Sequence, residues 1–171
     1  MIAPGLFEKK KGEAAKIELA LNASEKAATI DRFILKFFNA EIKVSGTVSN
    51  LGEAAPPGGM APSPVVNMTI ASNTIDFKPW NELVPMLKEY ELGGTAKLDA
   101  SAKGPSDKLG YKAKFVVNGL TAKAGNLKAQ PRFDATIDVA TDQIENLLIT
   151  MKAPANEFQF KGKLVSFAKP Q

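Results

Sequence analysis

Cysteine and histidine are both absent from this chain of 171 residues. Without cysteine there is no disulfide, no thiolate nucleophile and no soft metal site. Without histidine, the commonest general base and metal ligand is missing. These absences argue against an enzyme, and we expect no catalytic residues, no metal site and no cofactor.

Long apolar runs are also missing. No run of 18 apolar residues is present, so no segment is predicted to span a bilayer. The opening residues MIAPGLFEKKKGEAAK lack the charged start and apolar core of a signal peptide. The net charge of +4 is mild and does not call for a nucleic-acid partner. We expect residues 1–14 to be a disordered lead-in and residues 15–171 to form a single β domain.

Alternation of apolar and polar residues with a period of two fills most of the chain. A strand that is apolar on one side only is typical of antiparallel pairing. The sequence therefore predicts a mainly β, antiparallel protein of eight to nine strands. The clearest alternating segments are Ile42–Val48, Val66–Ile70, Ala96–Ala102, Tyr111–Val117, Phe133–Val139 and Phe158–Leu164.

One segment breaks this period. Lys78–Tyr90 has its apolar residues at helical spacing, and Pro79 sits where a helix can begin. Pro85 is expected to kink the helix or to restart it as a second short turn.

Three connections are predicted from their glycine, proline and polar content. Gly52–Pro64 holds four prolines and three glycines, and is expected to be an exposed, flexible loop. Gly104–Gly110 is predicted to be a compact turn, and Ala124-Gly125-Asn126 the tip of a hairpin.

Two stretches of the chain resemble each other. Ile30–Leu51 and Ile144–Phe167 both begin Ile-acid-x-(Phe/Leu) and run into an alternating strand with a central glycine, Gly46 or Gly162. An alternating segment precedes each copy. Self-similarity of this kind indicates a repeat β architecture, which forms long surfaces more readily than closed catalytic pockets.

The predicted helix is too short to cover eight or nine one-sided strands. The sheet must therefore close on itself, as a β-sandwich or barrel, or leave an apolar groove open. If it stays open, the apolar strand faces are candidates for contact with lipid. The candidate lining is Val44, Val48, Leu98, Phe115, Val117, Phe133, Ile137, Phe158, Phe160 and Leu164.

Polar groups that could be taken for catalytic residues have simpler explanations. Ser106-Asp107-Lys108 has the composition of a polar turn. Asp134 and Asp138 share one strand face, where alternating acids are usually solvated, and Lys112 and Lys114 are possible cross-strand partners.

From Asp76 to Phe167 the order of parts resembles the AsmA family, relatives of TamB and of the bridge-like lipid-transfer proteins. Ile75–Tyr90 is similar to the family's strand end and short helix, and Leu92–Leu98 to the strand that follows. Phe115–Leu120 is similar to the next strand, and Asp134–Val165 to the closing repeat. Ala40–Leu51 is similar to the closing strand of a preceding repeat.

The resemblance implies a curved, twisted β-groove in the periplasm of a Gram-negative bacterium, in a protein anchored to the inner membrane by an N-terminal helix. Such proteins are implicated in phospholipid transport and outer-membrane assembly. The implied partners are phospholipid acyl chains and other envelope proteins. This sequence lacks the anchor helix and is much shorter than a full family member, so it resembles an excised periplasmic piece.

A structural or ligand-binding β-sandwich, such as an adhesin or a carbohydrate-binding module, is the alternative. Carbohydrate modules present tryptophan and tyrosine platforms. This chain has one tryptophan, in the predicted helix, and two tyrosines, which favours the lipid interpretation.

Overall fold

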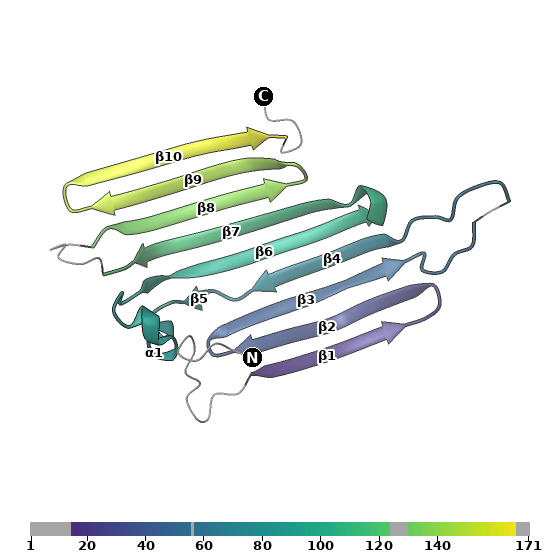
Figure 1. Ribbon diagram of the computed structural model, residues 1–171, viewed down its shortest axis with the longest axis horizontal. Coiled ribbons are helices and arrows are strands. Elements are labelled where there is room, and N and C mark those ends of the chain that lie inside the picture. The colour runs from purple at the N-terminus through teal and green to yellow at the C-terminus, as the bar shows by residue number, and fades with distance from the viewer. Residues whose placement is uncertain (1–14, 56, 124–129, 167–171) are drawn as a thin grey trace.

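A single antiparallel sheet makes up almost all of the computed structural model, which describes residues 15–55, 57–123 and 130–166 (Figure 1). Strands account for 65% of the described residues, far above the 20–25% of an ordinary globular domain. The strands are β1 (Lys16–Ala23), β2 (Ala27–Phe37), β3 (Ala40–Ser49), β4 (Val65–Ser72), β5 (Ile75–Asp76), β6 (Gly93–Pro105), β7 (Gly110–Thr121), β8 (Arg132–Ala140), β9 (Gln143–Ala153) and β10 (Asn156–Val165).

The strands follow one another across the sheet in the order β1-β2-β3-β4-β6-β7-β8-β9-β10, and β5 pairs beside β4 with the start of β6. Strands β1 and β10 are the two edges, and they do not pair with each other. The prediction of a mainly β, antiparallel protein with one short helix is therefore confirmed. The sandwich alternative does not hold for the described residues, because all of their strands belong to one sheet.

The two similar sequence stretches form equivalent parts of the sheet. The first is the hairpin β2–β3 and the second is the hairpin β9–β10, and each follows a strand, β1 or β8, that pairs with its first member. The molecule therefore contains two three-stranded meanders, β1–β3 and β8–β10. They lie at opposite sides of the sheet (Figure 1).

The shared Ile-acid-x-(Phe/Leu) motif marks a β-bulge in both meanders. In β2, Ile30 and Arg32 pair with successive residues of β1, so the backbone register with that strand skips Asp31. In β9, Glu145 is left over in the same way against β8. A bulge admits one extra residue on one strand and increases the local twist. The acid in the motif is thus the extra residue.

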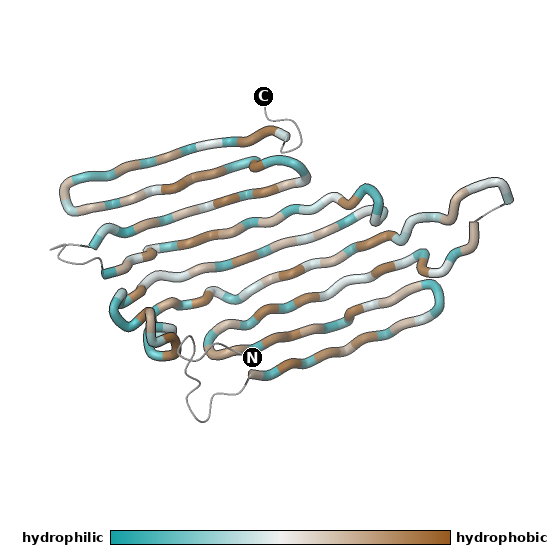
Figure 2. Tube along the Cα trace, viewed as in Figure 1, coloured by the Kyte–Doolittle hydropathy of each residue, from teal (hydrophilic) through white to brown (hydrophobic). Residues whose placement is uncertain are grey.

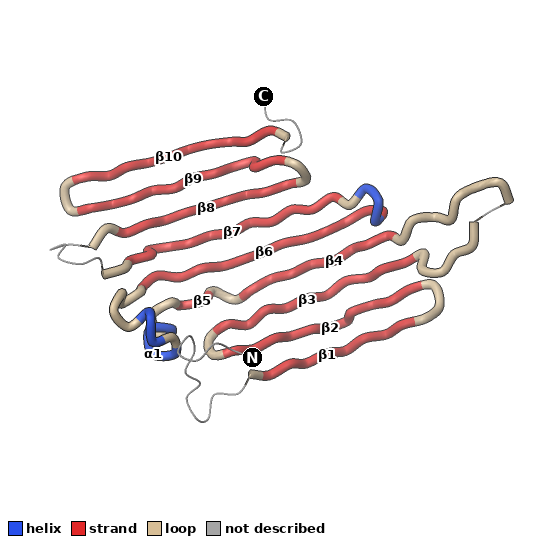
Figure 3. Tube along the Cα trace, viewed as in Figure 1, coloured by secondary structure: helices blue, strands red, loops and turns tan. Residues whose placement is uncertain are grey.

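The helical segment is shorter than the sequence predicts. The α-helix α1 covers only Trp80–Leu83, and a 3₁₀ turn follows at Pro85–Leu87 (Figure 3). The expected interruption at Pro85 is confirmed, since Val84 just before it has the extended backbone that a following proline favours. This segment lies at one end of the strands, beside the β2–β3 turn (Figure 1).

A small aromatic and amide cluster joins the helical segment to the sheet. The Trp80 ring meets Phe37 and Phe38 edge-on, at centroid distances of 5.9 and 5.8 Å. The indole N–H of Trp80 donates to Oδ1 of Asn39 at 2.7 Å. Leu83 is the most deeply buried large side chain among the described residues, at 1% exposure. This corner is the most enclosed part of the described fold.

Between β3 and β4 the chain forms a long connection of mostly exposed residues without strand pairing, as predicted for Gly52–Pro64. Its flexibility stays a prediction, and Pro56 lies outside the described residues. The expected turn at Gly104–Gly110 is the 3₁₀ turn Ser106–Lys108 between β6 and β7. The predicted lead-in, residues 1–14, and the predicted hairpin tip, Ala124-Gly125-Asn126, also lie outside the described residues.

Candidate functional site: the apolar face of the sheet

Strand register assigns each side chain to one of the two faces, because residues directly opposite each other across a ladder share a face. Val44 pairs with Ile70, which pairs with Ala100. The cross-strand partners of these residues can be followed in the same way through every strand to both edges of the sheet. All ten candidate lining residues lie on this face: Val44, Val48, Leu98, Phe115, Val117, Phe133, Ile137, Phe158, Phe160 and Leu164. We call it the apolar face and the opposite side the polar face.

Charged residues are missing from the apolar face of the described strands. Its polar side chains there are Ser72, Tyr111 and Asn156. Ser72 is buried, and its hydroxyl accepts a hydrogen bond from the Leu98 backbone N–H at 2.8 Å. The hydropathy colouring shows the resulting alternation along each strand (Figure 2). The face is therefore a continuous uncharged surface across the whole sheet.

Large side chains on this face remain open to solvent. Phe115, in the middle of the sheet, is 39% exposed, and Phe158 and Phe160 at one edge are each 59% exposed. Leu19 at the other edge is 61% exposed. Apolar surface of this extent marks a contact surface more often than a free one. Among the described residues of this face, Ser72, Ala96 and Val117 are buried, and the helical segment covers the corner around Trp80.

Small side chains hollow out the centre of the apolar face. The apolar-face residues of β6 include Ala96, Ala100 and Ala102, and Ala113 of β7 lies opposite Ala100. Two depressions of about 230 and 200 Å³ lie over these alanines and meet at Ile70. Their rims include Met68, Tyr111, Ile42, Leu98 and Phe115. The central strands thus form a shallow apolar floor between bulkier neighbours.

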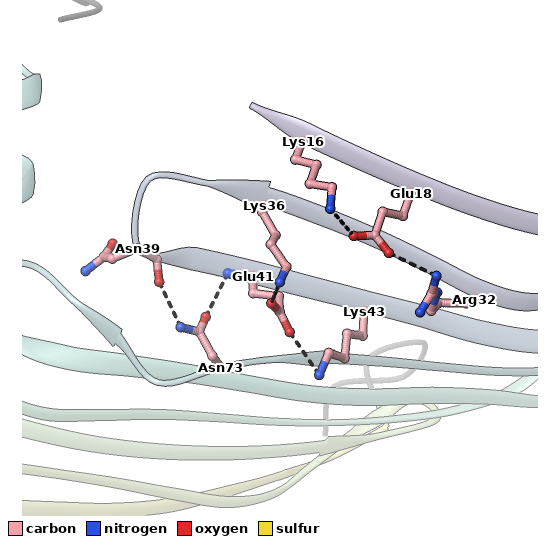
Figure 4. A network of polar contacts seen from close by, with 8 residues as sticks. All are labelled: Lys16, Glu18, Arg32, Lys36, Asn39, Glu41, Lys43 and Asn73. Atoms are coloured by element: carbon pink, nitrogen blue, oxygen red, sulfur yellow. Dashed lines mark hydrogen bonds and ion pairs between the residues drawn. The ribbon is translucent and has the colours of Figure 1, made fainter. Parts of the chain in front are cut away.

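The polar face carries the ion pairs of the strands. In the first meander, Glu18 accepts from Lys16 and Arg32 at 2.8 and 3.1 Å, and Glu41 accepts from Lys36 and Lys43 at 2.7 and 2.9 Å (Figure 4).

Ile34 lies between these two groups, since Glu18 and Lys43 are its cross-strand partners. It is only 8% exposed, although it is on the polar face. The aliphatic stems of long charged residues can cover apolar surface in this way.

The two acids of this network are stabilised in their charged forms. Hydrogen bonds from Lys36 and Lys43 lower the pKa of Glu41 to about 2. The hydrogen bond from Lys16 lowers the pKa of Glu18, and that to Glu41 raises the pKa of Lys36. These shifts follow from ion pairing on an open face, so they have a structural cause and do not indicate catalysis.

The two aspartates considered as paired carboxylates have separate structural partners. Asp134 accepts from the Gly119 backbone N–H at 2.6 Å. Asp138 lies opposite Lys114, with 3.9 Å between Oδ1 and Nζ, so this expected cross-strand pair is confirmed. Lys112 lies opposite Ala140, so its expected pairing with an aspartate is wrong.

Ser106-Asp107-Lys108 forms an exposed 3₁₀ turn, as a polar turn sequence should. In the described part of the chain, no three or more acidic, histidine or cysteine side chains lie close enough together to hold a metal ion. Residues 15–55, 57–123 and 130–166 contain no helix with the length and hydrophobicity to cross a membrane.

Several members of the apolar face escape simple alternation. They include Phe33 in β2 and Leu147 in β9, each of which follows a bulge, so that two residues instead of one separate it from the preceding apolar residue. The edge residues Ile17, Leu19 and Leu21 also belong to the face. The repeated Ile-acid-x-(Phe/Leu) motif could have revealed these bulges. Its two apolar residues are three positions apart, so they lie on the same face of a strand only if one residue between them is extra.

No protein family model, no curated protein and no solved structure matches this chain.

Proposed function

We propose that this chain is a periplasmic segment of an AsmA-like envelope protein of a Gram-negative bacterium. In this proposal the apolar face contacts phospholipid acyl chains during lipid transport and outer-membrane assembly. The parent protein would be held in the inner membrane by an N-terminal anchor helix. The order of sequence elements from Asp76 to Phe167 supports the family resemblance.

The uncharged apolar face is the observation that carries the proposal. It crosses the whole sheet, and no second sheet covers it in the described residues. An acyl chain that leaves water for such a surface gains roughly 0.8 kcal/mol for each buried methylene. The alanine floor of β6 and β7 provides depressions in which a chain can lie below the level of its neighbours. The polar face carries ion pairs and can therefore stay in contact with water.

Photo-crosslinking tests the proposal directly. A crosslinking residue replaces Ile137 in β8, two strands in from the edge, or Phe160 in the edge strand β10. The controls are their chain neighbours Thr136 and Lys161, which lie on the polar face. In a membrane-containing extract we expect the Ile137 and Phe160 positions to capture phospholipid several times more often than the controls. Equal capture at both faces would rule out the lipid-contact proposal for this segment.

A charge substitution provides a second readout. Ile137→Lys places an ammonium group on the apolar face, whereas Thr136→Lys adds the same charge to the polar face. We expect less phospholipid to co-purify with the first variant than with the second, measured by native mass spectrometry. Circular dichroism of both variants establishes that the sheet is retained.

A further inference from the structure

The outer edge of β10 is open in the described structure. Every residue of β10 except Gly162 is exposed, and β9 is the strand's one partner among the described residues. An unpaired edge strand offers a row of backbone donors and acceptors to any strand that can align with it. Neither a proline nor an extra residue interrupts β10, because the bulge in this hairpin belongs to β9. The edge is therefore geometrically fit for pairing.

The first meander shows what such an edge accepts. Strand β3 holds the same place as β10 in its repeat, and its outer edge pairs with β4 from Ser49 to Ile42 without a bulge. Gly46 of β3 lies directly opposite Met68, and the Met68 side chain fills the space above the glycine. Gly162 is the equivalent glycine in β10, and the nearest atoms to its Cβ position belong to Phe160 and Leu147 of its own meander. Leu147 lies opposite Gly162 on the inner side, as Ile30 lies opposite Gly46, so the element that β10 lacks is a large side chain opposite Gly162 on the outer side.

We propose that the outer edge of β10 pairs antiparallel with β10 of a second copy of this chain. The two-fold axis is perpendicular to the sheet, with Phe160 opposite Phe160 of the second copy. In this register Phe158 lies over Gly162 of the second copy, as Met68 lies over Gly46. An aromatic side chain across from an edge glycine is a known stabilising pair in sheets.

Charge complementarity and the packing at Gly162 together select this register. Glu157 lies opposite Lys163 of the second copy, twice by symmetry, and Gln159 lies opposite Lys161. A shift that places Lys161 opposite Lys161 brings like charges together, which is unfavourable for directly opposed residues. The opposite shift also pairs Glu157 with a lysine, Lys161, but it places Asn156 instead of an aromatic ring opposite Gly162. Glu157 has one ion pair within its own chain, a contact of 3.7 Å with Lys152.

The other edge of the sheet lacks this complementarity in the register that pairs β1 around its centre at Leu19. If β1 paired with itself around Leu19, Glu18 would face Ala20 and Lys16 would face Asn22. Glu18 is also already bound by Lys16 and Arg32. The two-fold axis at β10 keeps both apolar faces on the same side, so the paired molecule has one continuous apolar face. This inference does not depend on the proposed function.

Sedimentation velocity of the full chain over a concentration series tests the pairing. We expect the unmodified protein to form a dimer. Glu157→Lys should weaken the dimer roughly ten-fold or more, because two attractive cross-strand pairs become repulsive. Glu157→Lys combined with Lys163→Glu should restore it, since the opposed charges are exchanged. Glu89→Lys makes the same charge change at an exposed residue away from the edge and should have no effect.

Cysteine crosslinking tests the register, since the chain has no cysteine of its own. Under oxidation we expect Phe160→Cys to form a covalent dimer, because the two substituted residues lie opposite each other. Phe158→Cys and Leu19→Cys should crosslink far more slowly. A protein that stays monomeric, a dimer insensitive to Glu157→Lys, or preferential crosslinking of Leu19→Cys would each overturn the proposal.

Discussion

The two meanders, β1–β3 and β8–β10, share their strand order and the position of their bulge, but differ in what lies beside their third strand. Strand β3 is covered along its outer edge by β4, whereas β10 has no outer neighbour in the described structure. At Gly46 a Cβ atom would lie 2.2 Å from the Asn67 carbonyl oxygen. At Gly162 the nearest atom would be 3.4 Å away. The equivalent glycines therefore differ: neighbouring atoms of β4 leave no room for a side chain at Gly46, whereas Gly162 has room for one.

The polar faces of the meanders differ as well. In the first meander each of two glutamates binds two cations, above the buried side chain of Ile34. In the second, Asp138 combines a long ion pair to Lys114 with a hydrogen bond of 3.0 Å from Asn146. The repeat therefore conserves backbone register, while the polar contacts of each copy depend on its own residues.

The largest expected difference between the meanders is at the glycines. Gly46 has a φ of +152°, which side chains rarely adopt, and it has no room for a methyl group. We expect Gly46→Ala to lower the free energy of unfolding by about 2 kcal/mol or more, from overpacking and backbone strain. Gly162→Ala should be neutral or raise it by about 0.5 kcal/mol, because alanine fits there and restricts the unfolded chain.

Urea unfolding of both variants, at concentrations low enough to keep the chain monomeric, measures this difference. Equal losses at the two positions would show that the glycines are equivalent despite their different neighbours.

The second expected difference is in the response to pH. The pKa of Glu41 is lowered to about 2, so its contribution to stability is complete above the unfolded-state pKa and is lost as the pH falls from about 5 towards 2. Glu41→Gln should therefore destabilise the protein at neutral pH and converge with the unmodified protein at about pH 2. Urea midpoints across this range give the measurement.

Glu157→Gln is the matched change in the second meander. Glu157 contacts one cation at 3.7 Å, whereas Glu41 contacts two at 2.7 and 2.9 Å. We expect a smaller effect at neutral pH, measured on the monomer. A Glu41→Gln variant that keeps the full pH dependence of the unmodified protein would refute the role given to this ion network.

The smallest expected effect is in the connection that leaves the first meander. Ser49 and Val65 lie directly opposite each other, so a short turn can join β3 to β4. Deletion of residues 53–61 should change the free energy of unfolding by less than about 1 kcal/mol, since loop closure costs only about 0.6 kcal/mol per doubling of length. Strong amide-exchange protection across this segment, or a large loss of stability on deletion, would contradict the prediction.

Alternation in the sequence was sufficient to predict the antiparallel strands and the face of each candidate residue, but not whether the strands form one open sheet or a sandwich. Ile137 and Phe160 were assigned correctly to one face because side chains alternate strictly between bulges. The same argument missed Phe33 and Leu147, since a bulge shifts the phase by one residue. Helix length was overestimated because Lys78–Tyr90 has helical spacing, while Pro85 limits the α-helix to four residues.

Contacts that depend on distant parts of the chain could not be predicted from the sequence. The cluster of Trp80 with Phe37, Phe38 and Asn39 joins residues about 40 positions apart. The burial of Ile34 on the polar face depends on the lengths and directions of six charged side chains from three strands. Neither the Trp80 cluster nor the burial of Ile34 produces a periodic pattern in the sequence, because both depend on which strands become neighbours in the sheet.

The paired bulges have a mechanical consequence. In strands of plain alternation, a slip of two residues returns every side chain to its own face, so alternation alone does not distinguish registers two residues apart. The bulges at Asp31 and Glu145 fix the register. After a slip of two residues, the extra residue would no longer lie beside the position in the neighbouring strand that now accommodates it. A force along the strands would therefore have to break the interstrand hydrogen bonds of a meander together, because its strands have no equivalent register two residues away.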